Sequence, residues 1–187
     1  MNFFAVLLLV FSILFAAPDA FAADKKGKAA SKSEDPIVVM ETTKGPIKMV
    51  IYKSEAPITA NNFLGLVNRG FYNGLTFHRY EKGFCIQGGD PQGTGQGGSD
   101  KTIPLEKSPN LKHDSAGVLA MARTSDPNSA SSQFYFTLDA ASFLDNPPGY
   151  AAFGKVTEGL ENVMKLRKGD KMTKVYVQGA EPKAKGK

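Results

Sequence analysis

Residues 77–90 read Phe77-His78-Arg79-Tyr80-Glu81-Lys82-Gly83-Phe84-Cys85-Ile86-Gln87-Gly88-Gly89-Asp90. Two short β-rich runs flank Gly83, a pattern that predicts a tight hairpin. Alternation along the strands places Phe77 and Arg79 on one face, and it places Phe84 and Ile86 on the face opposite Cys85 and Gln87. An arginine on a strand is more often a solvated side chain than a functional one, so the hairpin alone leaves the role of Arg79 open.

Further short β-rich runs lie on both sides of this hairpin. Ile37–Thr42 and Ile47–Tyr52 are joined through Lys44-Gly45 and predict an opening hairpin. The strands of the 77–90 hairpin itself are Leu75–Tyr80 and Phe84–Gln87, and the other strand-like runs are Val118–Ala122, Gln133–Leu138, Tyr150–Val156 and Lys174–Val177.

Two segments have helical spacing. Pro57 suits a first helical position, and the apolar residues that follow recur every three to four positions until Gly70. A second helix is predicted after Gly159. We therefore expect a mostly β fold, a closed eight-stranded antiparallel β-barrel capped by two α-helices, because closure removes exposed strand edges. The segment 88–114 has no clear period, and a loop of that length in a compact domain is usually functional.

The ends of the chain differ in composition from its centre. Residues 1–22 hold an apolar run that ends in Ala20-Phe21-Ala22, which predicts a signal peptide cleaved near Ala22, with an uncleaved anchor as the alternative. Residues 23–35 are predicted to be a disordered charged linker, 36–180 one folded domain, and 181–187 a basic C-terminal tail. We expect a periplasmic or secreted protein without stable membrane association after cleavage, and a monomer.

Several other functions are disfavoured. Residues 93–98 satisfy G-x-G-x-x-G, but they follow Asp90-Pro91 and open no helix, so we expect no nucleotide cofactor. His78, His113 and the single cysteine, Cys85, lack the paired spacing of metal ligands. The formal net charge of +5 comes largely from lysine-rich ends, without a basic stripe that interleaves aromatic residues, so we expect no nucleic-acid partner.

The 77–90 segment closely resembles a signature of the cyclophilin family. Residues 117–124 and 132–136 resemble the family's G-x-L-x-M-A and S-Q-F-F-I strands, and 143–145 with 150–156 resemble the segment that ends its binding groove. The resemblance covers residues 36–180, and the Met-Ala-Arg-Thr and Gly-Tyr-Ala variants are similar to the bacterial exported branch. It implies a peptidyl-prolyl cis/trans isomerase that acts on X-Pro bonds of exported, partly folded polypeptides.

The same resemblance implies the residues of the site. Arg79 is expected to be the catalytic hydrogen-bond donor, and Gln87 to hold Arg79 and the substrate carbonyl. Some residues would wall the proline pocket, and others would bind or border the flanking peptide. The expected substrate-binding residues are His78, Phe84, Cys85, Met121, Ala122, Arg123, Thr124, Gln133, Tyr135, Phe143, Leu144 and Tyr150.

Three departures from the family pattern limit this transfer, and one of them is the proline-bearing loop 146–149 next to the groove. Tyr135 stands where many relatives have phenylalanine, which adds a hydroxyl group to the pocket wall. Phe143 stands where cyclosporin-sensitive relatives have tryptophan, and the chain has no tryptophan, so weak cyclosporin binding is expected. Two alternatives remain: a proline-peptide binding module or holdase chaperone with little turnover, and a basic protein tethered to anionic surfaces by its lysine-rich ends.

Overall fold

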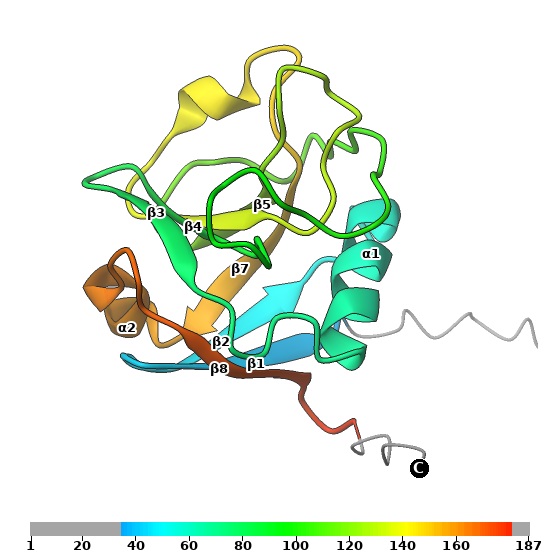
Figure 1. Cartoon of the computed structure of the whole chain (residues 1–187). Coiled ribbons are helices and arrows are strands. Elements are labelled where there is room, and N and C mark those ends of the chain that lie inside the picture. The colour runs from blue at the N-terminus through cyan, green and yellow to red at the C-terminus, as the bar shows by residue number, and fades with distance from the viewer. Residues whose placement is uncertain (1–34, 181–187) are drawn as a thin grey trace, which may run out of the picture. The chain divides into compact units, whose positions relative to one another are not determined.

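Eight strands and two α-helices make up residues 35–180, the part of the chain that the computed structural model describes (Figure 1). The predicted signal peptide, all of the predicted linker except Asp35, and the basic C-terminal tail lie outside the described residues. The elements are β1 (Ile37–Thr42), β2 (Gly45–Ile51), α1 (Pro57–Asn68), β3 (Phe77–Glu81), β4 (Cys85–Gly88), β5 (Val118–Met121), β6 (Phe134–Thr137), the 3-10 helix η1 (Ser142–Asp145), β7 (Ala152–Glu158), α2 (Leu160–Lys165) and β8 (Met172–Val177).

The opening hairpin and the first helix form as their sequences predict. β1 and β2 pair antiparallel, and the inward residues Ile47, Met49 and Ile51 are fully buried. Helix α1 begins at Pro57 and buries Phe63 against three other aromatic rings at centroid distances of 5.1–5.7 Å. The Glu106 carboxylate accepts hydrogen bonds from the first free N–H groups of α1, so the long loop caps this helix.

The strands form one antiparallel sheet in the order β3-β4-β6-β5-β7-β2-β1-β8. The prediction of a closed barrel was wrong, because the edge strands β3 and β8 share no ladder and the sheet is a curled half-barrel. Residues 74–77 and 169–172, around the starts of these two strands, are joined by the isolated bridge Thr76–Lys171 and by four backbone hydrogen bonds. Farther along, β3 has a register shift against β4 between Phe77 and Arg79. The Arg167 guanidinium covers this edge, 4.5 Å from the Tyr80 ring centroid.

The central strands are buried on both faces, which explains their nearly continuous apolar sequences. Leu119, Phe134 and Phe136 point to the main core inside the curl. The alternate residues, Ala120 and Tyr135 among them, point to a smaller cluster on the outer face. The outer cluster consists of Cys85, Val118, Ala120, Tyr135, Ala141, Leu144 and Ala152. The candidate site is built on this outer face, so the main core supports it from behind.

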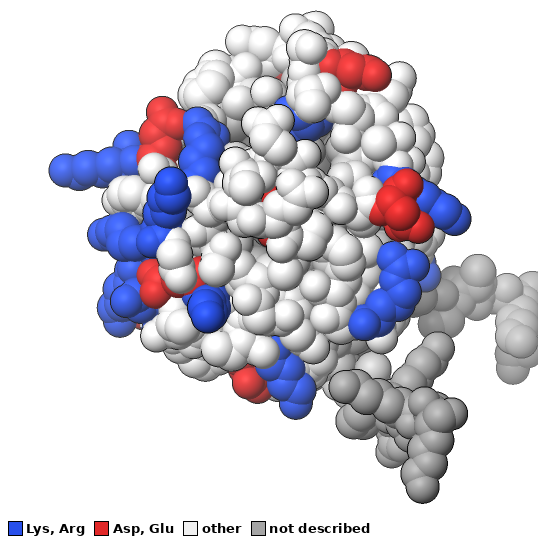
Figure 2. All heavy atoms as spheres, viewed as in Figure 1, with Lys and Arg blue, Asp and Glu red and all other residues white. Residues whose placement is uncertain are grey.

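Charged side chains are distributed unevenly over the surface. Figure 2 shows lysine and arginine side chains gathered on the side where Figure 1 places the β3–β4 turn and α2. Carboxylates interrupt this basic surface, since Glu81 pairs with Arg79 and Asp170 lies 3.4 Å from Lys44. No helix among residues 35–180 is long and apolar enough to span a lipid bilayer.

Candidate active site

Strand register brings the predicted catalytic pair together. Arg79 on β3 lies opposite Gln87 on β4, Gln87 lies opposite Tyr135 on β6, and Tyr135 lies opposite Ala120 on β5. Residues directly opposite each other on antiparallel strands point to the same face. The four side chains therefore form one row across the outer face of the sheet.

An apolar pocket of about 260 Å³ opens beside this row. Phe84 and Phe143 stand on one side with ring centroids 5.5 Å apart, and the Tyr150 ring meets Tyr135 edge-on at 6.2 Å. Ten residues, all among those predicted from the sequence, line the apolar pocket: Arg79, Phe84, Cys85, Gln87, Ala122, Arg123, Tyr135, Phe143, Leu144 and Tyr150. Its aromatic walls and few polar groups suit a small apolar ring held in a fixed orientation.

The guanidinium of Arg79 sits at the edge of the apolar pocket and is held from several sides. Its Nη1 donates to the Gln87 side-chain oxygen at 3.3 Å and lies 3.4 Å from the Cys85 sulfur. Its Nη2 forms an ion pair with Glu81, and the Phe84 ring centroid lies 5.7 Å from its central carbon. The Arg79 side chain remains 47% exposed, so it can reach a bound peptide.

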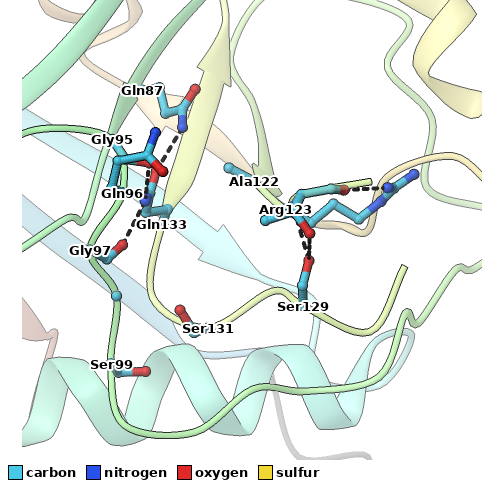
Figure 3. A pocket seen from close by; sticks show the side chains of 12 residues that line it. Gln87, Gly95, Gln96, Gly97, Ser99, Ala122, Arg123, Ser129, Ser131 and Gln133 are labelled. Atoms are coloured by element: carbon cyan, nitrogen blue, oxygen red, sulfur yellow. Dashed lines mark hydrogen bonds between the residues drawn. The ribbon is translucent and has the colours of Figure 1, made fainter. Parts of the chain in front are cut away.

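A second, polar pocket of about 320 Å³ adjoins the apolar pocket and shares Gln87, Ala122 and Arg123 with it. Figure 3 shows Gln133 between Gln87 and the 95–97 loop. The Gln133 amide nitrogen donates to the carbonyls of Gly95 and Gly97, and its oxygen accepts from the Gln87 amide at 2.8 Å. The polar pocket is lined by Gln87, Gly95, Gln96, Gly97, Gly98, Ser99, Ala122, Arg123, Thr124, Ser129, Ser131 and Gln133.

The buried carboxylate of Asp90 organises the glycine-rich loop of the polar pocket. It accepts backbone hydrogen bonds from Gln92 at 2.8 Å, Thr94 at 2.9 Å and Gly95 at 2.6 Å. Burial alone would raise the pKa of Asp90, but these backbone donors together hold that pKa below its usual range. A Cβ at Gly97 would collide with this carboxylate, which explains a glycine there without a nucleotide.

Arg123 fastens the opposite side of the site. Its guanidinium donates to the Gly149 carbonyl at 2.8 and 3.1 Å and lies 4.5 Å from the Tyr150 ring centroid. A further bond goes to the carbonyl of Thr124 at 2.8 Å. The Arg123 side chain thus joins the end of β5 to the loop that carries Tyr150.

The Tyr135 hydroxyl forms a hydrogen bond inside the protein. It lies 2.8 Å from the imidazole Nε2 of the fully buried His113, and burial raises the pKa of the Tyr135 phenol. The hydroxyl predicted to alter the pocket wall is therefore paired with His113.

A profile of the family described as cyclophilin type peptidyl-prolyl cis-trans isomerase matches residues 37–183. The chain belongs to the cyclophilin-type peptidyl-prolyl cis-trans isomerases. It is 43% identical over 136 residues to human peptidyl-prolyl cis-trans isomerase-like 1, covering 71% of this chain and 80% of that protein. The Gibberella zeae protein of the same name is 42% identical over 132 residues, covering 69% and 80%.

Solved structures agree with this assignment. A crystal structure of a Cryptosporidium parvum cyclophilin type peptidyl-prolyl cis-trans isomerase superposes with a TM-score of 0.71 and 31% identity, covering 79% of this chain and 99% of that one. A second crystal structure of that protein, in the presence of the dipeptide Ala-Pro, gives a TM-score of 0.70 and 32% identity, covering 77% and 99%. The relatives named here are all eukaryotic.

Twelve of the fourteen predicted site residues line the two pockets of this cyclophilin, and His78 and Met121 do not. Met121 was expected near the proline but belongs to the main core, because β5 turns alternate side chains inward. His78 lies beside Gly95 with both ring nitrogens buried and without hydrogen-bond partners, and burial lowers its pKa. The predicted alternation also failed at Phe84, which precedes β4 and packs with Cys85 on the outer face, whereas Ile86 enters the core.

Sequence reasoning missed three acidic residues and a histidine in this cyclophilin. Glu81 pairs with the expected catalytic arginine, Asp90 organises the loop, and Asp145 holds His113. Glu81 could have been found from its spacing, because residues two apart on a strand share a face. Among residues 35–180, no group of three or more His, Cys, Asp or Glu side chains could hold a metal ion.

Proposed function

We propose that this cyclophilin rotates X-Pro bonds by donating a hydrogen bond from Arg79 to the proline nitrogen. Rotation about a peptide bond faces a barrier of about 18–20 kcal/mol because amide resonance must be broken. Before proline the two isomers differ by only about 0.5–1 kcal/mol, and their uncatalysed exchange takes about 10–100 s. A catalyst therefore has to stabilise the twisted amide, in which the proline nitrogen has regained its lone pair.

The observation that carries this proposal is a guanidinium held by Gln87 at the edge of an apolar pocket. The apolar pocket would hold the proline ring, and Arg79 would meet the nitrogen lone pair that exists only in the twisted state. An interaction realised only in the transition state accelerates the reaction, and it gains strength where water is excluded. Arginine stays charged across the physiological pH range, so the donor needs no proton transfer.

The energy required exceeds what one donor supplies. A rate gain of about 10⁵ corresponds to about 7 kcal/mol of differential stabilisation. Removing one preorganised donor from an enzyme typically costs about 3–4 kcal/mol. The remainder would come from holding the flanking peptide beside Gln133, so that the X-Pro bond is bound in a conformation ready to twist.

We infer that the substrates are exported, partly folded polypeptides. The support is the leader at 1–22, which predicts export to the periplasm or secretion, together with the Met-Ala-Arg-Thr and Gly-Tyr-Ala variants similar to the bacterial exported branch. The mature enzyme would act as a monomer without cofactor or membrane association. Amino-terminal sequencing of the protein recovered from the periplasmic fraction tests this proposal, with Ala23 expected as the first residue. Recovery of the full-length chain from the cytosol would contradict it.

Weak binding of cyclosporin is part of the same proposal. Phe143 stands at the rim of the apolar pocket, 60% exposed, where a larger tryptophan would add both area and an N–H donor. The smaller ring offers less surface to a bulky cyclic peptide.

A binding module with little turnover is the competing function, since it would need the same two pockets. Exchange spectroscopy by NMR on a short Ala-Pro peptide separates the two. Catalysis predicts cis/trans exchange far faster than in buffer at catalytic protein concentrations. Peptide binding without faster exchange would support the binding module. Salt-sensitive binding to anionic vesicles that is lost with the lysine-rich ends would instead support surface tethering.

A further inference from the structure

His113 lies at the centre of a buried hydrogen-bonded chain behind the apolar pocket. Its imidazole is fully buried, with Nδ1 at 2.8 Å from an Asp145 carboxylate oxygen and Nε2 at 2.8 Å from the Tyr135 hydroxyl. The two rings are nearly parallel, at an interplanar angle of 18° and a centroid distance of 5.9 Å. His113 lines neither pocket, so it would reach a substrate only through its partners.

The Asp145 carboxylate fixes the direction of one hydrogen bond, and the tautomer of the ring then decides the other. A carboxylate only accepts, so Nδ1 carries a proton and donates it to Asp145. In the neutral ring Nε2 is then an acceptor, and the Tyr135 hydroxyl donates to it. In this tautomer the hydroxyl hydrogen points to His113, and the Tyr135 ring lines the apolar pocket.

The hydrogen-bonded chain Asp145–His113–Tyr135 joins two walls of the apolar pocket. Asp145 ends η1, the 3-10 helix that supplies Phe143 and Leu144 to one side of the pocket. Tyr135 supplies the other side from β6. Two backbone contacts support η1 independently of the imidazole. The His113 N–H donates to Asp145 at 3.2 Å, and the Ala141 N–H donates to the His113 carbonyl at 2.8 Å.

We infer that His113 is a positioning residue that fixes the Tyr135 ring as a wall of the proline pocket. The inference rests on the proposed use of the apolar pocket for the proline ring. A wall contacts the ring equally in the planar and twisted states, so its loss weakens binding and leaves the bound exchange rate nearly unchanged. Arg79 acts only on the twisted state, so its loss slows the bound exchange and leaves the peptide Kd nearly unchanged.

Two substitutions at His113 separate its hydrogen bond to Asp145 from its hydrogen bond to Tyr135. His113→Asn places an amide donor near the position of Nδ1, which keeps the Asp145 contact and loses the Tyr135 contact. His113→Gln reaches the Tyr135 hydroxyl and loses the Asp145 contact. Both variants retain the backbone bond that anchors Asp145. Tyr135→Phe removes the hydroxyl itself, and Thr137→Val serves as a control, because Thr137 is a buried hydrogen-bonded residue on the same strand that lines neither pocket.

NMR titration of each variant with an Ala-Pro peptide, paired with exchange spectroscopy at saturation, tests the inference. We expect His113→Asn and Tyr135→Phe each to raise the peptide Kd by about three- to tenfold, because the loosened Tyr135 ring has to be fixed when the peptide binds, at a cost of up to about one neutral hydrogen bond. The double variant should be no weaker than either single one. His113→Gln should stay within about twofold of wild type, as should Thr137→Val, and saturated exchange rates should change by less than about twofold.

Three results would overturn the inference. The first is a His113→Asn variant whose Kd stays within about twofold of wild type while its urea midpoint falls as that of Thr137→Val does, since that pattern shows a purely structural role. Equal weakening by His113→Gln and His113→Asn would show that the Tyr135 contact is not the one that matters. No binding of the peptide by wild type would overturn both the inference and the proposed function. Binding without accelerated exchange would overturn only the proposed catalysis, and the Kd comparison would still decide the role of His113.

Discussion

Asp90→Asn removes one buried charge without a change in side-chain size, and the structure allows its cost to be worked out. One carboxylate oxygen of Asp90 accepts from the backbone N–H groups of Thr94 and Gly95, with a longer bond of 3.3 Å from the Thr94 hydroxyl, and the other accepts from the Gln92 N–H. If the oxygen of the new amide keeps the first pair, its NH₂ group faces the Gln92 N–H, and that unpaired buried donor costs about 1–3 kcal/mol. The two surviving bonds become neutral and lose about 1 kcal/mol together. We expect a total loss of about 2–4 kcal/mol in the free energy of unfolding at pH 7.

Urea unfolding followed by far-UV circular dichroism measures this loss. Asp126→Asn is the control, because Asp126 is exposed and its side chain accepts a bond only from the Asn128 N–H at 2.9 Å, so it should change stability by less than about 0.5 kcal/mol. The pKa of Asp90 lies lower in the folded than in the unfolded chain. Its stabilisation is therefore present above about pH 4 and is lost as the pH falls through the lowered folded value. A loss below about 1 kcal/mol at pH 7, or an equal difference at pH 7 and pH 3, would refute this account.

Two other substitutions test neighbouring parts of the site. Glu81→Gln releases Arg79 from its exposed ion pair, so we expect kcat/KM at low salt to rise about two- to fivefold, with unfolding free energy unchanged within about 0.5 kcal/mol. Added salt should raise the activity of wild type, which keeps the ion pair, but not that of Glu81→Gln. A lower kcat/KM in Glu81→Gln than in wild type would show instead that Glu81 orients the arginine. Phe143→Trp should lower the cyclosporin Kd at least about tenfold in isothermal titration, by added aromatic area and an N–H donor. A low-nanomolar Kd for the unsubstituted protein would contradict the expected weak binding.

Local patterns were sufficient for most of the architecture. The hairpin of β1 and β2, the start of α1 at Pro57 and the existence of two short strands around Gly83 follow from alternation, helical spacing and turn residues. The faces predicted for the strands around Gly83 were wrong, since the structure separates Phe77 from Arg79 and Phe84 from Ile86. The closed barrel was a wrong prediction because local patterns do not show whether the two edge strands pair; β3 and β8 share no ladder, and β3 has a register shift against β4. A one-residue irregularity of this kind has no distinct sequence signal.

In the candidate site, too, some contacts could be predicted from the sequence and others could not. Resemblance identified Arg79 and Gln87, and the register of β3 and β4 then explains why they meet. The contacts of His113 with Asp145 and Tyr135 span 32 and 22 positions and depend on how an irregular loop crosses the sheet, so no local pattern predicts them. Periodicity also could not tell which face of β5 is the pocket, since that strand is buried on both faces.

The role of Arg79 is the central claim, and one comparison tests it most directly. Cis/trans exchange of an Ala-Pro peptide would be measured by NMR under conditions in which the peptide is fully bound. The proteins compared are the unsubstituted chain from Ala23, its Arg79→Ala variant and its Arg79→Lys variant, each first shown to be folded by circular dichroism. We predict that Arg79→Ala slows bound exchange at least about a hundredfold while the peptide Kd changes by less than about threefold, and that Arg79→Lys, which lacks the planar fork, recovers only part of the rate. A loss of less than about tenfold in folded Arg79→Ala would contradict the assignment of Arg79 as the catalytic donor.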